Sequence, residues 1–545
     1  MRCDAGDYDT AASLLEEIDD LIQQWGHYRL TVQLNELVLK KLKDKNYRMF
    51  SLNELGWAYS ILGNLQRAIN FYQQGLDTAR EAKNRSWEGP FLGNLGTAYA
   101  ALGNAHKAIK FYEQRIAITR EIGDRRGEGV VLGNLGRRYA ELGEVRKAIE
   151  FYKQALVIAR EVGNRGDEGE NLGALGSAYA VLGNTLKAIE FYEQALVIAQ
   201  EVGYRGSEGA ILGALGSAYA ALGNTRKAIE LYEQALVIAQ EVGNRGGEGA
   251  ILGALGSAYN YLGNIHKAIE YQKAALKIAQ EIGDQSGESS HLSNLGNRYS
   301  VLAEYKKTIE NYEKSILIKQ EIGDRNGEAN SLENAGDAWL SLVEYQKAEE
   351  NYKHAIQIAD EISFPQTQNY ARCGLAKAYL IQNDLVNARV TIEAALQYDV
   401  PQNNHNASAL HGIIALRQGE RETAQEAFTK SIAQADEILV KTPDYYSALD
   451  AKGLALCGLI LAGRSDPSMP TKTSDGKPVP PDKVTVSDGR VATTIDDAIE
   501  TFQKARKIAP HAGVVKSVLR LFDELVKCDE GGILKDVRKA VEGVE

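Results

Sequence analysis

Hydrophobic and polar positions follow the period of an α-helix and recur in blocks of 40 residues. In one block, Leu92, Leu95, Tyr99 and Leu102 are spaced three, four and three residues apart, which places them on one helix face. A glycine and an asparagine at 103–104 then end this first helix, and a second helix with its own apolar stripe follows. A fixed period of roughly 20–50 residues indicates a solenoid of stacked units.

Every block aligns on one glycine in its first helix, with a leucine before it and an aromatic residue three positions after it. A glycine inside a helix costs about 1 kcal/mol relative to alanine, so its recurrence indicates close helix packing. We expect it to face the small residue twelve positions later, in the antiparallel second helix. The pattern predicts an all-α fold of about twelve helix pairs. The aligned residues are Gly56, Gly96, Gly136, Gly176, Gly216, Gly256, Gly296 and Gly336, with Ala376 as a ninth.

Less regular segments flank the regular blocks. We predict an atypical N-terminal helix pair over 1–49, the regular array over 50–400, irregular pairs over 401–510 and C-terminal capping helices over 511–545. The N-terminal pair fits a cap or the remainder of a junction with an upstream domain, and the sequence leaves both open. The insert at about 464–494 holds half of the prolines, and we interpret it as a surface loop rather than a binding loop, with a small hairpin over 484–492.

The block motif resembles the tetratricopeptide repeat. Leu135, Gly136 and Tyr139 are followed by Ala, Tyr and Ala at intervals of four and three, and this resemblance covers most of 50–510. The 40-residue unit resembles those of Pins-family adaptors and of tetratricopeptide arrays in bacterial signalling proteins. The resemblance implies a right-handed superhelical solenoid whose concave groove, lined by the first helix of each pair, binds a protein or peptide segment.

The resemblance also implies which residues line the groove, namely those just before and after the Leu-Gly pair. Asparagine amides at these positions can donate to and accept from a peptide backbone. The central blocks offer mainly small side chains, so we expect discrimination between partners to come from the outer blocks. The groove residues carried over are Asn53, Trp57, Asn94, Thr97, Asn134, Arg137, Ser177, Ser217, Ser257, Asn260, Tyr261, Asn294, Asn297, Asn334 and Asp337.

One class of tetratricopeptide groove clamps a terminal carboxylate with lysine and asparagine. Here, one such clamp position holds only glycine in the blocks from the second to the sixth, which argues against a carboxylate clamp. These glycines are Gly93, Gly133, Gly173, Gly213 and Gly253.

The turn between blocks repeats an arginine and a glutamate three positions apart, as in Arg125 and Glu128. A glutamate in the first turn suits the helix dipole, and Asp124 before it can cap the helix. We therefore favour a structural role over an acidic ladder that binds a ligand.

Charge and hydropathy narrow the class of protein. The net charge of −11 disfavours nucleic acid as a partner, because phosphate binding relies on lysine and arginine. The N-terminus has no signal-peptide core, and the longest apolar run, 454–463, is too short to span a bilayer. We expect a soluble cytoplasmic protein with no membrane partner. A homo-oligomer is compatible with the sequence but has no support in it.

We find no motif for catalysis, metal binding or a cofactor. The chain has no phosphate-binding loop, no HExxH pair and no GxSxG elbow, and its four cysteines show no ligand spacing. A Cys373 or Cys457 nucleophile partnered by His411 is conceivable, but nothing in the local sequence favours it. We therefore expect a non-enzymatic protein without cofactors.

The sequence thus predicts a protein-interaction scaffold, an adaptor or sensor arm that binds a protein segment in its groove. A second hypothesis is a self-assembly or docking module for a separate effector enzyme, acting through the outer faces and end caps. A hidden hydrolase is a third hypothesis, and the missing catalytic motifs argue against it.

Overall fold

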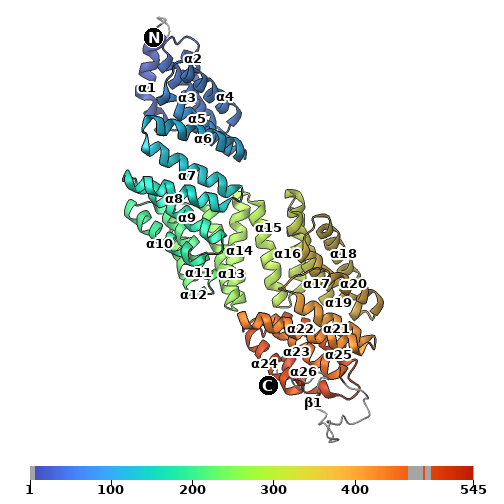
Figure 1. Cartoon of the computed structure of the whole chain (residues 1–545). Helices are drawn as coiled ribbons and strands as arrows, with labels where there is room; N and C mark the ends of the chain where they lie inside the picture. Colours follow the sequence, from blue (N-terminus) through green and yellow to red (C-terminus); the bar gives the residue numbers. More distant parts are fainter. Residues whose placement is uncertain (1–6, 464–482, 485–492, 544–545) are drawn as a thin grey trace. The chain divides into compact units, whose positions relative to one another are not determined.

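A computed structural model describes residues 7–463, 483–484 and 493–543 of the 545-residue chain. These residues form 26 α-helices, one short 3-10 helix and one pairing of two-residue strands (Figure 1). Consecutive helices pack as antiparallel pairs, which confirms the all-α prediction. The chain divides into two compact units, unit 1 (Met1–Asn244) and unit 2 (Arg245–Glu545).

Unit 1 contains twelve described helices, in which α3 begins the regular pairs. Their bounds are α1 (Tyr8–Gln24), α2 (Tyr28–Leu39), α3 (Lys45–Ile61), α4 (Leu65–Glu81), α5 (Arg85–Ala101), α6 (Ala105–Ile122), α7 (Arg125–Glu141), α8 (Val145–Glu161), α9 (Arg165–Val181), α10 (Thr185–Val202), α11 (Arg205–Ala221) and α12 (Thr225–Glu241).

Unit 2 continues the same pairing and ends in α25, a short 3-10 helix and the short helix α26. Its elements are α13 (Arg245–Tyr261), α14 (Ile265–Ile282), α15 (Gln285–Val301), α16 (Tyr305–Ile322), α17 (Arg325–Ser341), α18 (Tyr345–Glu361), α19 (Pro365–Ile381), α20 (Leu385–Ala395), α21 (Asn404–Arg417), α22 (Arg421–Lys441), α23 (Tyr446–Ala462), β1 (Lys483–Val484), β2 (Thr493–Thr494), α24 (Ile495–Ile508), α25 (Ala512–Val526), η1 (Ile533–Lys535) and α26 (Val537–Glu542). We call α3, α5 and the later odd-numbered helices up to α23 the A helices, and their partners the B helices.

The helix ends follow from local sequence. Gly123 ends α6 with φ +73°, a left-handed conformation that glycine adopts without strain. Asp124 then caps α7, since its Oδ1 accepts a hydrogen bond from the Gly127 amide at 2.8 Å. The same succession of left-handed glycine and capping Asp or Asn recurs at several other turns of the array, for example at Gly103 and Asn104 and at Gly283 and Asp284.

The aligned glycine makes room for an aromatic ring. A Cβ at Gly136 would lie 2.6 Å from Cε1 of Tyr152 in the paired B helix, and Gly216 has the same relation to Tyr232. The atoms nearest to this position belong to the tyrosine four positions beyond Ala148, so the tyrosine ring, beside the expected alanine, fills the space next to the glycine. The close packing itself is present, with Leu135 and Ala148 buried on either side.

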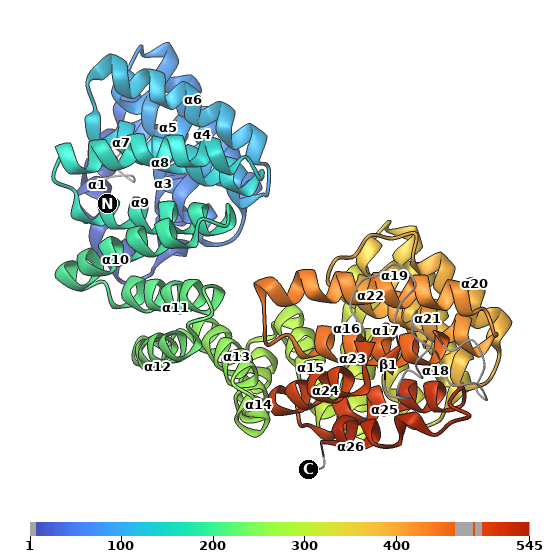
Figure 2. The same ribbon diagram turned by 60° about the horizontal axis from the view of Figure 1, so that its bottom comes forward.

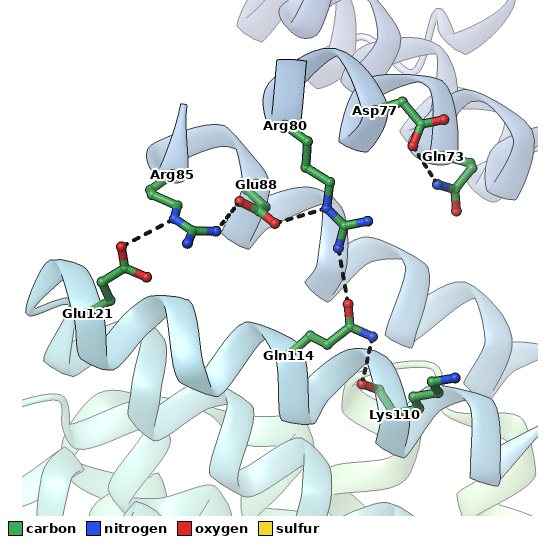
Figure 3. A network of polar contacts seen from close by, with 8 residues as sticks. All are labelled: Gln73, Asp77, Arg80, Arg85, Glu88, Lys110, Gln114 and Glu121. Carbon is green, nitrogen blue, oxygen red and sulfur yellow. Dashed lines mark hydrogen bonds and ion pairs between the residues drawn. The ribbon is translucent and has the colours of Figure 1, made fainter. Parts of the chain in front are cut away.

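The repeated arginine and glutamate form a ladder of ion pairs between helices. In Figure 3, Glu88 accepts from Arg80 Nε at 3.0 Å and from Arg85 Nη1 at 2.6 Å. Arg85 also reaches Glu121, near the end of the next B helix, at 3.2 Å. Arg125 joins Glu128 and Glu161 in the same way. These contacts support the structural interpretation of the turn motif.

The C-terminal helices of unit 2 take two different positions. Helix α26 packs mainly against α24, whereas α25 contacts α15, α21 and α23, all of them A helices (Figure 2). Arg520 of α25 donates to the Ser341 hydroxyl and carbonyl at the end of α17, at 2.8 and 3.0 Å. Helix α25 therefore lies along the A-helix face of unit 2. The predicted division into four segments stays a prediction.

Most of the predicted insert, 464–482 and 485–492, lies outside the described residues. At its edges, β1 pairs antiparallel with β2, Lys483 opposite Thr494 and Val484 opposite Thr493. Among the helices described here, none is both long and apolar enough to cross a membrane.

Candidate functional site

One position links the A helices into a candidate binding face. The residue directly after the aligned glycine, together with its equivalents, is called the A row here. It is half-buried on α3, where Trp57 lies, exposed on α5, α7, α9, α11 and α13, and half-buried again on α15, α17 and α19. The exposed members are Thr97, Arg137, Ser177, Ser217 and Ser257, and the half-buried ones of unit 2 are Asn297, Asp337 and Lys377. The A row thus changes from an open to a covered surface within unit 2, where α25 packs.

Several A-row side chains also hold their own helix pair together. A tyrosine hydroxyl of the B helix, fifteen residues later, bonds to the A-row side chain in five pairs. The distances are 3.1 Å for Thr97 and Tyr112, 3.0 Å for Tyr192 and Ser177, 3.1 Å for Tyr232 and Ser217, 2.5 Å for Tyr312 and Asn297, and 2.6 Å for Tyr352 and Asp337. These residues therefore have a structural role beside any binding role.

The remaining predicted residues of unit 1 lie on α3, α5 and α7. Asn94 donates to Asn53 on the neighbouring A helix at 2.9 Å. Trp57 packs edge-on against Tyr28, with ring centroids 5.4 Å apart. The side chains of Asn134 and Arg137 have no bond to other residues in the described part of unit 1, so their polar groups remain available.

The structure separates the predicted residues of unit 2 into two groups. Asn297 and Asp337 line one cavity. The others do not line it: Ser257 bonds to the Gly253 carbonyl, Asn334 donates to the Asn330 carbonyl at 2.8 Å, and Asn260, Tyr261 and Asn294 lie elsewhere on α13 and α15.

One cavity of unit 2 lies between the A helices and α25, with a volume of about 510 Å³. Helices α15, α17, α19, α21 and α23 supply mostly polar lining residues. Helix α25 supplies Gly513, Val514, Ser517, Val518 and Leu521, a mainly apolar wall. We call this space the α25 cavity.

Two carboxyl groups and one ammonium group meet in the α25 cavity. Lys377 Nζ donates to Asp337 Oδ1 at 2.8 Å. Burial opposes ionisation of Asp337, but the charge and hydrogen bond of Lys377 lower its pKa below the usual value. Glu333 has no hydrogen-bond or ion-pair partner within the described residues, and burial together with the charge of Asp337 raises its pKa.

Two further charged residues line the α25 cavity. Asp450 forms a buried ion pair with Arg506 of α24. Burial raises the pKa of Asp450 to about 6 although Arg506 opposes this shift. The Arg298 side chain is half-buried, its Nε is buried without a hydrogen-bond partner, and burial lowers its pKa.

Neither Cys373 nor Cys457 has the environment of an activated nucleophile. Burial raises the pKa of the Cys373 thiol to about 12 and also raises that of Cys457. A nucleophilic cysteine requires the opposite shift, toward the thiolate. Across the described residues, no cluster of three or more His, Cys, Asp or Glu side chains could hold a metal ion.

Sequence reasoning missed Glu333, Lys377 and the return of α25. Lys377 occupies the A-row position of the ninth block, which follows directly from the alignment on Ala376. Glu333 occupies the clamp position that holds Gly93 to Gly253 in earlier blocks, and the change from glycine to glutamate was a readable signal. The return of α25 had no such signal, because amphipathicity alone does not indicate which face a helix covers.

Comparisons with known proteins agree with the repeat architecture. Family models described as tetratricopeptide repeat match residues 51–82, 90–161, 167–241 and 250–282. No curated protein matches the chain.

Similar solved structures include three proteins of low sequence identity to this chain. A signal transduction ATPase with numerous domains and a tetratricopeptide repeat sensor, from Pyrococcus horikoshii, is 17% identical over 72% of each chain, with a TM-score of 0.49. A Rap protein complexed with competence and sporulation factor is 14% identical over 66% of this chain and 98% of that one, with a TM-score of 0.43. BtubC from P. vanneervenii is 23% identical over 40% of this chain and 92% of that one, with a TM-score of 0.38.

Proposed function

The chain belongs to the tetratricopeptide repeat proteins, and from this premise we propose that the A-helix face of unit 1 binds a helical segment of a partner protein. Tetratricopeptide repeats generally bind protein or peptide partners. The chain acts as an interaction scaffold, either as an adaptor or as the sensor arm of a larger assembly.

The observation that carries this proposal is the contrast between exposed and covered members of the A row. Thr97, Arg137 and Ser177 are exposed in unit 1, whereas Asn297 and Asp337 are half-buried in unit 2, where they line the cavity whose other wall is α25. A helix of the chain itself therefore occupies the equivalent face of the later repeats. Because the repeats share one geometry, the open face of unit 1 suits a helix supplied by another protein.

The chemistry of the open face defines the expected segment. Gly173 has no atom within 4 Å of the place a Cβ would take, so a partner backbone can approach α9 closely. Arg137 is exposed and has no hydrogen bond or ion pair to other described residues. The expected partner is an amphipathic helix with small residues toward α9 and an acidic side chain opposite Arg137.

Site-specific crosslinking tests the location of the partner. A photo-crosslinking amino acid replaces Ser177 on the A-helix face in one variant and Val197 on the B helix α10 in another. After irradiation in the source cell, we expect a crosslinked partner with the first variant and none with the second. Crosslinks from the Val197 position alone would overturn the proposal.

A pair of substitutions then tests the chemistry. Asn134→Ala combined with Arg137→Ala removes the free amide and the free guanidinium, and we expect affinity for the crosslinked partner to fall at least about tenfold. Arg146→Ala, at an exposed position of the B helix α8, is the matched control and leaves binding unchanged. Circular dichroism verifies equal helicity, and unchanged binding by the double variant would contradict the proposal.

A second candidate function is self-assembly or docking through the B helices. Three valines at the same repeat position, Val157, Val197 and Val237, are 55%, 53% and 54% exposed on α8, α10 and α12. Exposed apolar side chains aligned along successive B helices are typical of an interface. Light scattering tests this: a mass that rises with concentration, and returns to that of a monomer when all three become aspartate, would favour it. A monomer at every concentration would exclude it.

A further inference from the structure

The α25 cavity has the size and the lining of a small-molecule site. Its volume of about 510 Å³ falls within the range of roughly 300–1,000 Å³ that ligand pockets occupy. One wall, from Val514, Val518 and Leu521 of α25, is apolar. The facing walls from the A helices carry charged and amide side chains, so the cavity combines apolar surface with a few polar groups, as ligand pockets do.

Charge pairing accounts for only part of the lining. The charged side chains that line the cavity are Arg298, Glu333, Asp337, Lys377 and Asp450. Lys377 is engaged by Asp337 at 2.8 Å, and Asp450 is engaged by Arg506 from outside the lining. One carboxyl group, on α17, and one guanidinium group, on α15, remain.

These two remaining groups have no protein partner in the described residues. Glu333 makes no hydrogen bond or ion pair, whereas the ammonium group of Lys377 donates to Asp337. Arg298 makes no side-chain hydrogen bond or ion pair, and its Nε is buried without a partner. A buried guanidinium nitrogen without a partner is costly, and an ammonium group beside Glu333 would favour the ionised form of its carboxyl group. An unpartnered acid and an unpartnered base in one cavity therefore point to a ligand that supplies both counter-charges.

We propose that the α25 cavity binds a small zwitterionic ligand, whose ammonium group pairs with Glu333 and whose carboxylate group pairs with Arg298. The ligand class comprises amino acids and compounds with the same two end groups. A ligand with only a cationic end would leave Arg298 unpaired, and one with only an anionic end would leave Glu333 unpaired. The apolar wall of α25 packs against the carbon chain between the two ends.

A homologous series of ω-amino acids, from 3-aminopropanoate to 6-aminohexanoate, tests whether the α25 cavity binds ligands that carry both end groups. Each compound is titrated into the full chain by calorimetry, beside the alkylamine and the alkyl carboxylate of equal length. Charge-assisted hydrogen bonds strengthen binding when both ends are paired. We expect one chain length to bind best, about ten- to a hundredfold more tightly than either singly charged analogue.

Two variants assign each end of the ligand. Glu333→Gln should lower the affinity for the best ω-amino acid to that for the alkyl carboxylate, and should leave carboxylate binding unchanged. Arg298→Gln should lower the affinity for the best ω-amino acid to the affinity for the alkylamine. Arg138→Gln is the matched control, because Arg138 occupies the same repeat position on α7 and does not line the cavity.

Thermal unfolding of every variant separates loss of binding from loss of the fold. If Arg298→Gln unfolds the chain, Arg298→Lys retains the charge but loses the planar fork, and should still weaken binding. The proposal is overturned if no member of the series binds at millimolar concentration to the folded wild type. It is equally overturned if the alkylamine alone binds as tightly as the ω-amino acid.

Discussion

Gly513 of α25 packs directly on the backbone of α15, since a Cβ at this position would lie 2.0 Å from the Ser300 carbonyl oxygen. A carbonyl oxygen fixed in a helix cannot move aside as a flexible side chain can. Any larger residue at 513 must therefore displace α25 from the A helices. This single contact joins two parts of unit 2 that are more than 200 residues apart in the chain.

Gly513→Ala should therefore loosen α25 and lower the free energy of unfolding by about 1–3 kcal/mol. Urea unfolding measures the loss, and hydrogen exchange should increase over Ala512–Val526. Gly173→Ala is the control: its Cβ would meet nothing within 4 Å, and it should stabilise helix α9 by up to about 1 kcal/mol. Unchanged stability and exchange in Gly513→Ala would contradict the packing described.

The ion pair between Arg417 of α21 and Glu524 of α25 should be essential for the packing of α25 against the A helices. Both side chains are largely buried, 11% and 4% exposed. Glu524→Gln leaves the guanidinium without its counter-charge, and we expect a loss of about 3–5 kcal/mol in unfolding free energy. Glu437→Gln removes an exposed ion pair with Lys441 and should change stability by less than about 0.5 kcal/mol. Equal effects of the two substitutions would argue against a buried pair.

The ladder in unit 1 predicts a loss of stability in acid. Burial opposes ionisation of Glu128, but hydrogen bonds from Arg120 and Arg125 lower its pKa below the usual value of 4.5. The ionised group therefore stabilises the fold fully above that value, and this contribution is lost as the pH falls through the lower, folded-state pKa. Glu128→Gln should cost about 1–3 kcal/mol at pH 7, and the difference from wild type should shrink below pH 4.5.

Chemical denaturation at a series of pH values measures this difference. Glu113→Gln, on the exposed surface of α6, is the control and should show no such pH dependence. A difference between wild type and Glu128→Gln that stays constant down to pH 2 would be inconsistent with the ladder.

Glu333 should produce the opposite pH dependence. Burial, followed by the charge of Asp337, raises the pKa of Glu333 from 4.5 to about 8. Between these two values the folded state retains a proton that the unfolded state has released, so stability falls as the pH rises from 4.5 to about 8 and then levels off. Glu333→Gln cannot ionise, and should be more stable than wild type above pH 8 by on the order of 3 kcal/mol.

Thermal unfolding between pH 5 and pH 9 provides the measurement. Glu313→Gln, at an exposed position of the B helix α16, serves as the control and should follow the wild-type curve. If wild type and Glu333→Gln keep the same difference across this range, Glu333 is ionised throughout and its carboxyl group is better solvated than its burial indicates.

The helix pairs could be predicted from the sequence because their determinants are local. Gly136 and the Tyr152 ring that covers it belong to one repeat. Both positions can therefore be identified from the 40-residue alignment, although the alignment does not show that they are in contact. The contact of the glycine with tyrosine, beside the expected alanine, depends on how a ring folds across the helix interface. Spacing along the sequence does not determine that orientation.

The candidate site could be predicted only in part, for a related reason. Asn297 and Asp337 follow from the repeat register, and both line the α25 cavity. Glu333 was overlooked because its register position is glycine in most blocks. The contact between Gly513 and Ser300 depends on tertiary packing over a long sequence separation, and the amphipathic pattern of α25 would equally suit a helix that closes the end of the array.

The sequence separation of the α25 contacts also bears on the order of events during synthesis. Helix pairs in unit 1 depend on neighbours made within seconds of one another, so they can form while the ribosome is still translating. The α25 cavity forms much later than the walls on its A-helix side, because Val514, Val518 and Leu521 are translated more than 200 residues after Arg298. Until α25 has packed, the A-helix face of the later repeats is uncovered. Chaperones or other nascent chains can then bind to this face. A chain truncated before α25 would retain that immature surface permanently.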